Sequence, residues 1–264
     1  MKNIDPAICA ALLRGVTDQL HASKAGAPAG TDVASSIRQV KQASAWAYAT
    51  LKHALLAHYP EIPWSEAEMD LDLQQSAEFA AAYWVYDPID GAYHYAQGLP
   101  LWSSSLALIR TGRVVLSFVY DPSRQEMFTA CSGEGAYLNG VAIHAGTKTA
   151  LAGAVVGTAL PIAASPDGLA LPAAADTLKR VAGHVFVVRM LASASLQLAY
   201  VAAGRLDAYW EPGRDIYDWF AGAQLVEEAG GALSDRTGAA FGFGADGIVA
   251  SSLALHAALV RLVK

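Results

Sequence analysis

The apolar residues near the start of the chain recur at three- and four-residue spacing, which predicts two amphipathic helices. The first helix covers about residues 5–22, and the second covers about residues 33–58, where Tyr59-Pro60 ends it. Thr31 or Asp32 is placed to cap the second helix. Because the apolar pattern of the second helix runs without a break, we expect one long helix there.

Further along, short apolar runs are separated by turn residues, and this pattern predicts strands. The expected strands cover residues 83–86, 103–110, 114–120, 127–130 and 136–138. The turn at Leu138-Asn139-Gly140 is a strong hairpin signal. Strands joined by short turns form a meander, so we expect an antiparallel sheet in this part of the chain.

The second half of the chain alternates between strands and helices. Strands are expected at residues 154–158, 184–189, 206–210 and 247–250, and helices at 172–182, 193–203, 215–229 and 252–263. Gly204 and Gly230 stand where helix C-caps are expected. We therefore predict an α/β (α+β) fold as a single domain over residues 1–264, with an antiparallel-rich half at 1–148 and an αβ half at 149–264.

Composition narrows the functional classes. A formal net charge of −6 argues against a nucleic-acid partner bound by a broad basic surface. The most apolar stretch, residues 149–176, is interrupted by prolines and should not span a membrane, and the N-terminal residues do not read as a secretory signal. Cys9 and Cys131 are isolated, which suits a reducing compartment. We expect a soluble, cytoplasmic protein.

The first predicted strand runs directly into the sequence Asp-Pro-Ile-Asp-Gly at residues 87–91. Proline stops the strand ladder and Gly91 permits a sharp turn, so Asp87 and Asp90 can converge just past the strand end. Two carboxylates and the Ile89 carbonyl between them are hard oxygen ligands of the kind that Mg²⁺ takes. A metal held there can bind a phosphate and activate a water molecule. For the tetrapeptide alone, a turn with two solvated aspartates is the simpler interpretation.

Two separate segments of the chain match a known family. The first runs from Trp84-Val85-Tyr86-Asp87-Pro88-Ile89-Asp90-Gly91 through Val119-Tyr120-Asp121-Pro122 to Gly135-Ala136-Tyr137-Leu138-Asn139-Gly140. The second comprises Ala202-Ala203-Gly204-Arg205-Leu206-Asp207-Ala208-Tyr209-Trp210-Glu211, Asp218 and Glu228-Ala229-Gly230-Gly231. The chain thus resembles the inositol monophosphatase family, within the larger group of Mg²⁺-dependent, lithium-sensitive sugar phosphatases. The similarity covers most of the chain and is weakest before residue 80.

The resemblance implies a layered αβαβα sandwich of the inositol monophosphatase/fructose-bisphosphatase type. It implies a Mg²⁺-dependent phosphomonoesterase that hydrolyses a small polyol or sugar phosphate such as inositol monophosphate, and a homodimer. The implied metal ligands, for two or three Mg²⁺ ions, are Glu66, Asp87, the Ile89 carbonyl, Asp90 and Asp218.

The same resemblance assigns the remaining roles in the site. Glu66, Asp87 and Asp90 are the implied catalytic residues, and the N–H groups of Gly91 and Ala92 are placed to receive phosphate. The implied substrate-binding residues are Asp90, Ala192, Ser193, Ala194, Glu211 and Asp218.

The sequence departs from the family pattern at three positions that matter for the chemistry. Ala92 stands where the family has a threonine whose hydroxyl helps to position the attacking water, and the aspartate paired with that threonine falls on Ser44. The family's Gly-Glu-Glu reads Ser-Glu-Ala-Glu at residues 65–68, where Glu66 is our first choice for the metal ligand and Glu68 the second. His94 is an alternative base near neutral pH.

These departures leave two alternative functions open. The chain is either a phosphatase or a catalytically impaired relative that acts as a metal- and anion-binding regulatory or interaction protein. If it is a phosphatase, a nucleotide 3′-phosphate or a fructose bisphosphate is the alternative substrate. The residues past Glu211 and the loop at residues 159–170 are the places where the substrate would be decided.

Overall fold

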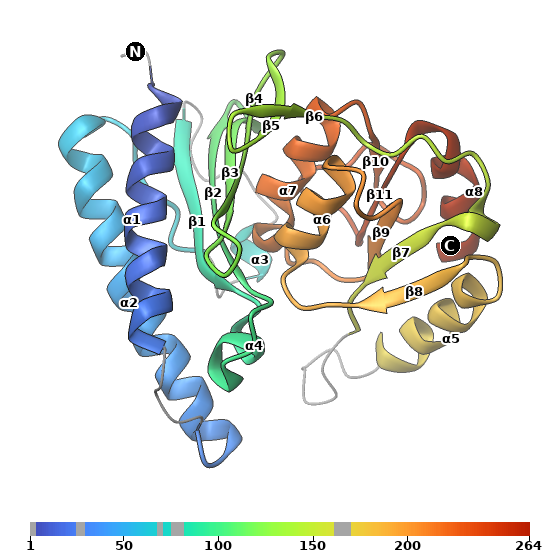
Figure 1. The fold of residues 1–264 in the computed structure, drawn as a ribbon, viewed down its shortest axis with the longest axis horizontal. Helices are drawn as coiled ribbons and strands as arrows, with labels where there is room; N and C mark the ends of the chain where they lie inside the picture. Colours follow the sequence, from blue (N-terminus) through green and yellow to red (C-terminus); the bar gives the residue numbers. More distant parts are fainter. Residues whose placement is uncertain (1–3, 25–29, 68–70, 75–81, 161–169) are drawn as a thin grey trace.

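The computed structural model describes residues 4–24, 30–67, 71–74, 82–160 and 170–264, and Figure 1 shows how their helices and strands stack. The described elements form five layers in the order helix, sheet, helix, sheet, helix. This arrangement confirms the predicted layered αβαβα sandwich.

The first layer contains α1 (Pro6–Lys24) and α2 (Val33–His58), which confirm both predicted N-terminal helices. Asp32 caps α2: its carboxylate accepts a hydrogen bond from the backbone N–H of Ser35 at 2.6 Å, and the Ser35 hydroxyl accepts one from the Asp32 N–H. The helix is continuous, as its apolar pattern predicted. No helix within the described ranges is long and apolar enough to cross a membrane.

The second layer is an antiparallel sheet in which the described strands follow one another in sequence order. Its strands are β1 (Ala82–Asp90), β2 (Ser103–Arg110), β3 (Arg113–Asp121), β4 (Glu126–Cys131), β5 (Gly135–Leu138) and β6 (Val141–Ile143). One face packs on α1 and α2 through a cluster that includes Leu13, Leu51 and Trp84. The predicted meander is therefore correct, and β6 extends it by one strand.

The third layer consists of α6 (Ala194–Ala202) and α7 (Tyr217–Glu228), which lie between the two sheets and are almost wholly buried. The fourth layer is a sheet of described strands in the order β10-β11-β9-β7-β8. These strands are β7 (Val155–Thr158), β8 (Val187–Met190), β9 (Ala208–Glu211), β10 (Ala232–Ser234) and β11 (Ile248–Ser251). In this sheet β7 runs parallel to both β8 and β9, as expected for an alternating αβ half.

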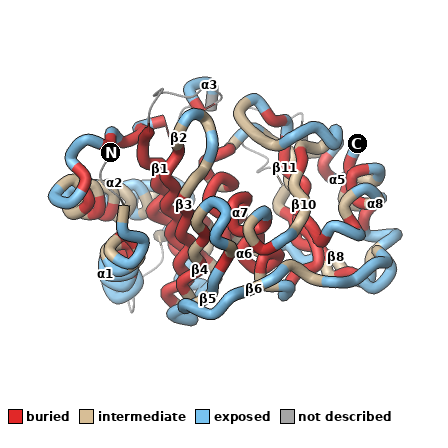
Figure 2. The backbone as a smooth tube through the Cα atoms, turned by 90° about the horizontal axis from the view of Figure 1, so that it is seen from above, coloured by how far each residue is buried: buried red, intermediate tan, exposed pale blue. Residues whose placement is uncertain are grey.

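The fifth layer is formed by α5 (Ala170–Ala182) and α8 (Leu253–Val263), which cover the outer face of the second sheet. Figure 2 shows that buried residues follow the sheets and the middle helices, whereas exposed residues line the outer helices. Three short helices complete the described elements: α3 (Leu71–Gln74), α4 (Ala92–Gln97) and the 3-10 helix η1 (Leu151–Gly153).

One sequence prediction about β1 is wrong. We expected the strand to end before Asp87, but β1 continues through the Asp-Pro-Ile-Asp sequence to Asp90. Asp87 lies opposite Ser105 and Asp90 lies opposite Ser103, so three steps along β1 match two steps along β2. This offset is a β-bulge, and a bulge tolerates a proline that cannot donate to the ladder.

Candidate active site

The bulge in β1 places two aspartates beside a third from the middle helical layer. The backbone N–H of Ile89 donates to Asp87 Oδ1 at 2.9 Å, which stabilises the bulge by a bond between its own residues. The Ser104 hydroxyl of β2 donates to the Pro88 carbonyl at 2.6 Å and ties the bulge to the neighbouring strand. Asp218 comes from the first turn of α7. Within the described ranges, carboxylate oxygens of Asp87, Asp90 and Asp218 lie within 4.8 Å of one another. The structure therefore brings the predicted metal ligand Asp218 to the two predicted metal-ligating aspartates of β1, which lie more than a hundred residues earlier in the sequence.

Asp90 is fixed by the start of α6. Its Oδ2 accepts hydrogen bonds from the Ser193 hydroxyl at 2.8 Å, the Ser195 N–H at 2.7 Å and the Ser195 hydroxyl at 2.5 Å. Its Oδ1 accepts a further bond from the Ala194 N–H at 3.1 Å. A helix N-terminus presents free N–H groups and favours a negative charge, so α6 orients this buried carboxylate.

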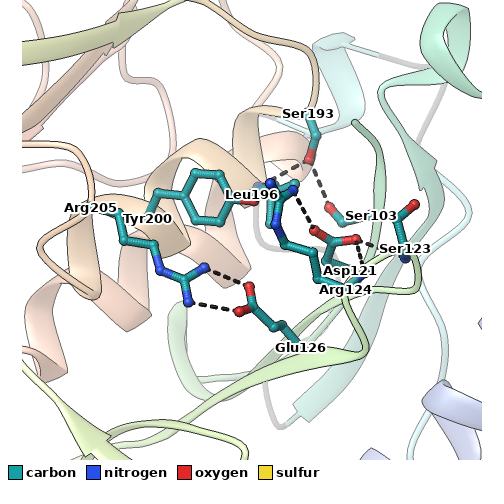
Figure 3. Close-up of polar contacts among 9 residues, drawn as sticks. All are labelled: Ser103, Asp121, Ser123, Arg124, Glu126, Ser193, Leu196, Tyr200 and Arg205. Carbon is teal, nitrogen blue, oxygen red and sulfur yellow. Dashed lines mark hydrogen bonds and ion pairs between the residues drawn. The ribbon is translucent and has the colours of Figure 1, made fainter. Parts of the chain in front are cut away.

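Figure 3 shows how α6 itself is positioned on the first sheet. At its start, the Ser193 hydroxyl lies 2.7 Å from the Ser103 hydroxyl of β2. Just beyond its end, Arg205 donates two hydrogen bonds to the Glu126 carboxylate of β4, at 2.5 and 2.7 Å. Bidentate pairs of this kind fix geometry well. The helix that orients Asp90 is thus tied to the sheet near both of its ends.

Gly91 lies where the backbone of β1 closely approaches neighbouring segments. Its φ of 92° lies in the left-handed region, and a Cβ there would lie 3.1 Å from the Leu101 carbonyl oxygen and 3.2 Å from the Ser193 nitrogen. Ser193 also has a positive φ, 63°, which is costly for a residue with a side chain. Glycine is therefore required for β1 to turn into α4 while touching the start of α6.

The acidic centre holds closely spaced carboxylates, of which Asp87 and Asp90 are buried and Asp218 is half-buried. Burial, followed by the nearby carboxylates of Asp215, Asp90, Asp87 and Glu211, holds the pKa of Asp218 well above its ordinary value. Burial also raises the pKa of Asp90, even though its hydrogen bonds act in the opposite direction. No lysine or arginine within the described ranges forms an ion pair with Asp90, Asp215, Asp218 or Glu211.

Buried carboxylates without a compensating cation are costly. An all-oxygen donor set of this kind fits a hard divalent cation such as Mg²⁺, which would supply the missing positive charge. The donor set therefore suits a hard divalent metal ion, and its identity as Mg²⁺ stays a prediction.

Glu211 lies at the end of β9 with one carboxylate oxygen already engaged. Oε2 accepts hydrogen bonds from the Tyr209 hydroxyl at 2.5 Å and from the Trp219 indole at 2.7 Å. Oε1 accepts none from the described residues. Burial raises the pKa of Glu211 to about 7, although both donors act to lower it. The two bonds thus hold the Glu211 side chain in place, and they leave Oε1 available to accept a hydrogen bond from a hydroxyl group.

The other predicted residues lie in different settings. Ser193 and Ala194 both bind Asp90, and Ala192 precedes them on the same segment. Ala92 is exposed at the start of α4, and its side chain is a methyl group. His94 is half-buried in α4, where burial lowers its pKa.

The structure does not bring Glu66 to the aspartates. Its side chain is 76% exposed and forms an ion pair with Lys52 at 3.0 Å. The neighbouring Ala67 is fully buried, and the Ser65 hydroxyl contacts the Tyr217 hydroxyl beside Asp218. Glu68, our second choice, lies outside the described residues, as does most of the loop at about residues 159–170. The role of Glu66 stays a prediction.

Several residues of the site were missed at the sequence level. Ser103 and Ser195 position Asp90 and Ser193, Tyr209 holds Glu211, and the charge of Asp215 raises the pKa of Asp218. Only Asp215 carries a signal in the sequence, because it lies three residues before an acid that opens a helix.

The fold and the acidic centre define a layered α/β protein with a site suited to a divalent cation and a phosphate. The model of the inositol monophosphatase family matches residues 6–264, so the chain belongs to this family of metal-dependent phosphatases. The match covers nearly the whole chain, including the segment before residue 80.

Individual relatives agree with this assignment. The chain is 42% identical over 167 residues to the Nus factor SuhB of Pseudomonas aeruginosa, across 63% of this chain and 61% of that protein. It is 36% identical over 182 residues to the inositol-1-monophosphatase of Mesorhizobium japonicum, across 69% of this chain and 67% of that protein. The matched segment thus spans about three fifths of the length of the SuhB relative.

Solved structures agree as well. The Thermotoga maritima IMPase superimposes with a TM-score of 0.80 at 26% identity, covering 96% of this chain and 94% of that one. The extragenic suppressor protein suhB of Bartonella henselae gives a TM-score of 0.79 at 26% identity, covering 96% of this chain and 98% of that one. Both comparisons support the same layered fold.

Proposed function

We propose that the protein is a Mg²⁺-dependent phosphomonoesterase acting on a small polyol or sugar phosphate such as inositol monophosphate. The observation that carries the proposal is the meeting of the buried Asp87 and Asp90 with the half-buried Asp218 in one acidic centre. Relatives named inositol-1-monophosphatase support the substrate class. Two or three ions are expected, because the family pattern implies that number.

Asp87, Asp90, Asp218 and the Ile89 carbonyl would hold the metal. When bound, Mg²⁺ would neutralise charge on the phosphate and lower the pKa of a coordinated water. Glu66 can join this ligand set only by giving up its ion pair with Lys52.

Groups of the chain itself would bind and orient the substrate. The backbone N–H groups of Gly91 and Ala92, at the turn into α4, would bind phosphate oxygens. Glu211 Oε1 would accept a hydrogen bond from a substrate hydroxyl, because Oε2 already accepts hydrogen bonds from Tyr209 and Trp219. Each contact orients the ester relative to the three aspartates, which is how positioning lowers a barrier.

The experiment is phosphate release by the purified protein with Mg²⁺. The panel contains inositol monophosphates, sugar phosphates, a nucleotide 3′-phosphate and fructose bisphosphate. Asp90→Asn should abolish release, whereas Asp176→Asn, the same change at an exposed position on α5, should leave it unchanged. Equal release by wild type and Asp90→Asn would refute the assignment.

A second candidate function is a catalytically impaired relative that binds metal and anion as a regulatory or interaction protein. The observation that favours it is Ala92, which brings no hydroxyl to the start of α4, together with Ser44 in place of a carboxylate on α2. Relatives named Nus factor SuhB also point away from a purely metabolic role.

Loss of one positioning group typically slows a reaction by about 10²–10⁴-fold. The double change Ala92→Thr, Ser44→Asp should therefore raise a low rate by about that factor. A flat response would show that the missing pair does not limit turnover.

A further inference from the structure

Glu211, the acid at the end of β9, accepts a hydrogen bond from a tryptophan of the neighbouring helix α7. We propose that this residue, Trp219, is a positioning residue that sets the substrate specificity of the site. It would do so by fixing Glu211, so that Oε1 accepts a hydrogen bond from a hydroxyl group of the substrate. This inference rests on the proposed phosphomonoesterase function and deepens it, because it assigns to Trp219 a preference for phosphate esters that carry free hydroxyl groups over esters that carry none.

The first turn of α7 contacts both the acidic centre and Glu211. Asp218 and Trp219 are neighbours in this turn, and the side chains of consecutive helical residues point about 100° apart. The Asp218 carboxylate lies with those of Asp87 and Asp90, whereas the Trp219 indole donates to Glu211 Oε2 at 2.7 Å. The helix thus links the proposed metal site to the carboxylate that is proposed to bind the substrate hydroxyl.

Trp219 is itself fixed by packing. The residue is 1% exposed, and its ring lies 6.1 Å from that of Phe241, which also packs against Phe220 at 6.5 Å. An indole has one N–H donor and no acceptor, so the packing that fixes the ring also fixes the direction of its one hydrogen bond. The position of Glu211 Oε2 is therefore determined by a buried and packed ring.

The second sheet holds Glu211 from the other side. Glu211 lies opposite Ile248 of β11, and this pairing fixes its backbone. Tyr209 lies two residues earlier on the same face of β9, and its hydroxyl donates to Oε2 at 2.5 Å. Hydrogen bonds to a carboxylate are strong, and a rotation of the Glu211 side chain would break two of them. Oε1 thereby keeps one orientation, which recognition of a particular substrate hydroxyl requires.

Burial of an indole does not by itself explain the bond to Glu211. The indole nitrogens of Trp64, Trp84 and Trp210 are also shielded from solvent, and they have no hydrogen-bond partner within the part of the chain that the structure describes. The protein thus tolerates buried indoles without an acceptor, and the bond between Trp219 and Glu211 is a specific feature of the site. Trp210, which is 0% exposed and precedes Glu211 in β9, offers a matched control.

The test measures kcat and KM for two esters in the presence of Mg²⁺. An inositol monophosphate carries free hydroxyl groups, and p-nitrophenyl phosphate carries none, so the selectivity is the ratio of kcat/KM for the first to kcat/KM for the second. Trp219→Phe removes the indole donor but keeps an aromatic ring. It should lower the selectivity by about 10–100-fold, because a misplaced binding group can cost up to about 100-fold. Trp210→Phe removes an indole that donates no hydrogen bond to a described residue, and it should keep the wild-type selectivity.

A double-mutant cycle shows whether Trp219 acts through Glu211. Glu211→Ala should lower the selectivity at least as much as Trp219→Phe does. In a protein that already carries Glu211→Ala, adding Trp219→Phe should change the selectivity by less than about twofold. A loss of equal size with and without Glu211 would overturn the inference. Tyr209→Phe, which removes the other donor to Oε2, should also lower the selectivity and provides a second variant if Trp219→Phe folds poorly.

Thermal unfolding separates positioning from general stability. Both tryptophan substitutions remove buried apolar surface, so both should lower the thermal midpoint. Only Trp219→Phe should lower the selectivity as well. Equal losses of selectivity in Trp210→Phe and Trp219→Phe would assign the effect to general loosening of the fold and overturn the inference.

The outcomes distinguish this inference from the proposed function. Wild-type selectivity in Trp219→Phe, with phosphate release that still requires Mg²⁺ and Asp90, would overturn the role of Trp219 and leave the phosphatase standing. No phosphate release from either ester by wild type would overturn the proposed function and this inference with it.

Discussion

Ser195 donates both its backbone N–H, at 2.7 Å, and its hydroxyl, at 2.5 Å, to the same oxygen of Asp90. The two residues lie 105 positions apart, on α6 and β1. The proposed metal ligand Asp90 and the start of the buried helix α6 therefore form one hydrogen-bonded unit. A substitution in either should alter both the metal site and the stability of the helix.

Removing the Ser195 hydroxyl should destabilise the fold and loosen the site together. A hydrogen bond to a charged group contributes about 1.5–3 kcal/mol, so Ser195→Ala should lower the free energy of unfolding by about that amount. Mg²⁺ affinity should fall as well, because Asp90 loses one of the donors that orient it. Urea unfolding and Mg²⁺ titration check this, with Ser132→Ala on an exposed turn as the control. Unchanged stability in Ser195→Ala would contradict it.

Gly91 should not tolerate a side chain. Gly140 also has a positive φ, but a Cβ there would meet nothing within 4 Å. A Cβ at Gly91 would instead make close contacts with Leu101 and Ser193. Gly91→Ala should therefore cost at least about 1 kcal/mol more in unfolding free energy than Gly140→Ala. Mg²⁺ binding should weaken only in Gly91→Ala. Equal losses in the two variants would show that backbone strain, rather than close approach, explains the glycine.

The metal-free protein should lose stability as the pH rises. Burial raises the pKa of Glu211 to about 7 in the folded protein, against an ordinary pKa of 4.5 for glutamate. Between these values the folded state holds a proton that the unfolded state has lost, so the free energy of unfolding falls as pH rises through this window. Asp90 and Asp218, whose pKa values are also raised, act in the same direction.

Thermal unfolding at pH 5, 6, 7 and 8 in the presence of a chelator measures this effect. Glu211→Gln should reduce the loss of thermal stability with rising pH, because glutamine does not titrate. Its side chain can still accept the hydrogen bonds from Tyr209 and Trp219. Saturating Mg²⁺ should restore stability at high pH. A metal-free protein whose midpoint rises from pH 5 to pH 8 would contradict the account of the acidic centre.

The homodimer implied by the family has a candidate surface on the second sheet. Within the described strands β8 is an edge strand, and Phe186 and Met190 at its ends are 73% and 54% exposed. Open edges with apolar side chains favour association. Phe186→Asp should shift a dimer toward monomer in light scattering, whereas Val33→Asp, at an exposed position on the helix α2, should not. A dimer that survives Phe186→Asp would place the interface elsewhere.

Much of the fold follows from local patterns in the sequence. The spacing of apolar residues predicted α1 and α2, and the Asn139-Gly140 turn predicted the hairpin between β5 and β6. These features depend on a few neighbouring residues. The bulge in β1 could not be predicted, because it depends on how β1 pairs with β2, and local rules suggested a strand end at the proline.

The candidate site was predictable only in part. Asp87 and Asp90 lie close in sequence, and the family pattern supplied Asp218 and Glu211. The direction of Glu66 depends on an ion pair with Lys52 on α2, and the orientation of Asp90 depends on Ser193 and Ser195 at the start of α6. Contacts between distant segments decide such orientations, and no spacing rule contains them.

The central claim is that Asp87, Asp90 and Asp218 form a metal centre for phosphate ester hydrolysis. The most direct measurement is phosphate release from inositol monophosphate as a function of Mg²⁺ concentration, for wild type and Asp218→Asn. We predict release that rises with Mg²⁺, vanishes with a chelator and is absent in Asp218→Asn. Release that is independent of Mg²⁺, or unchanged in Asp218→Asn, would contradict the account.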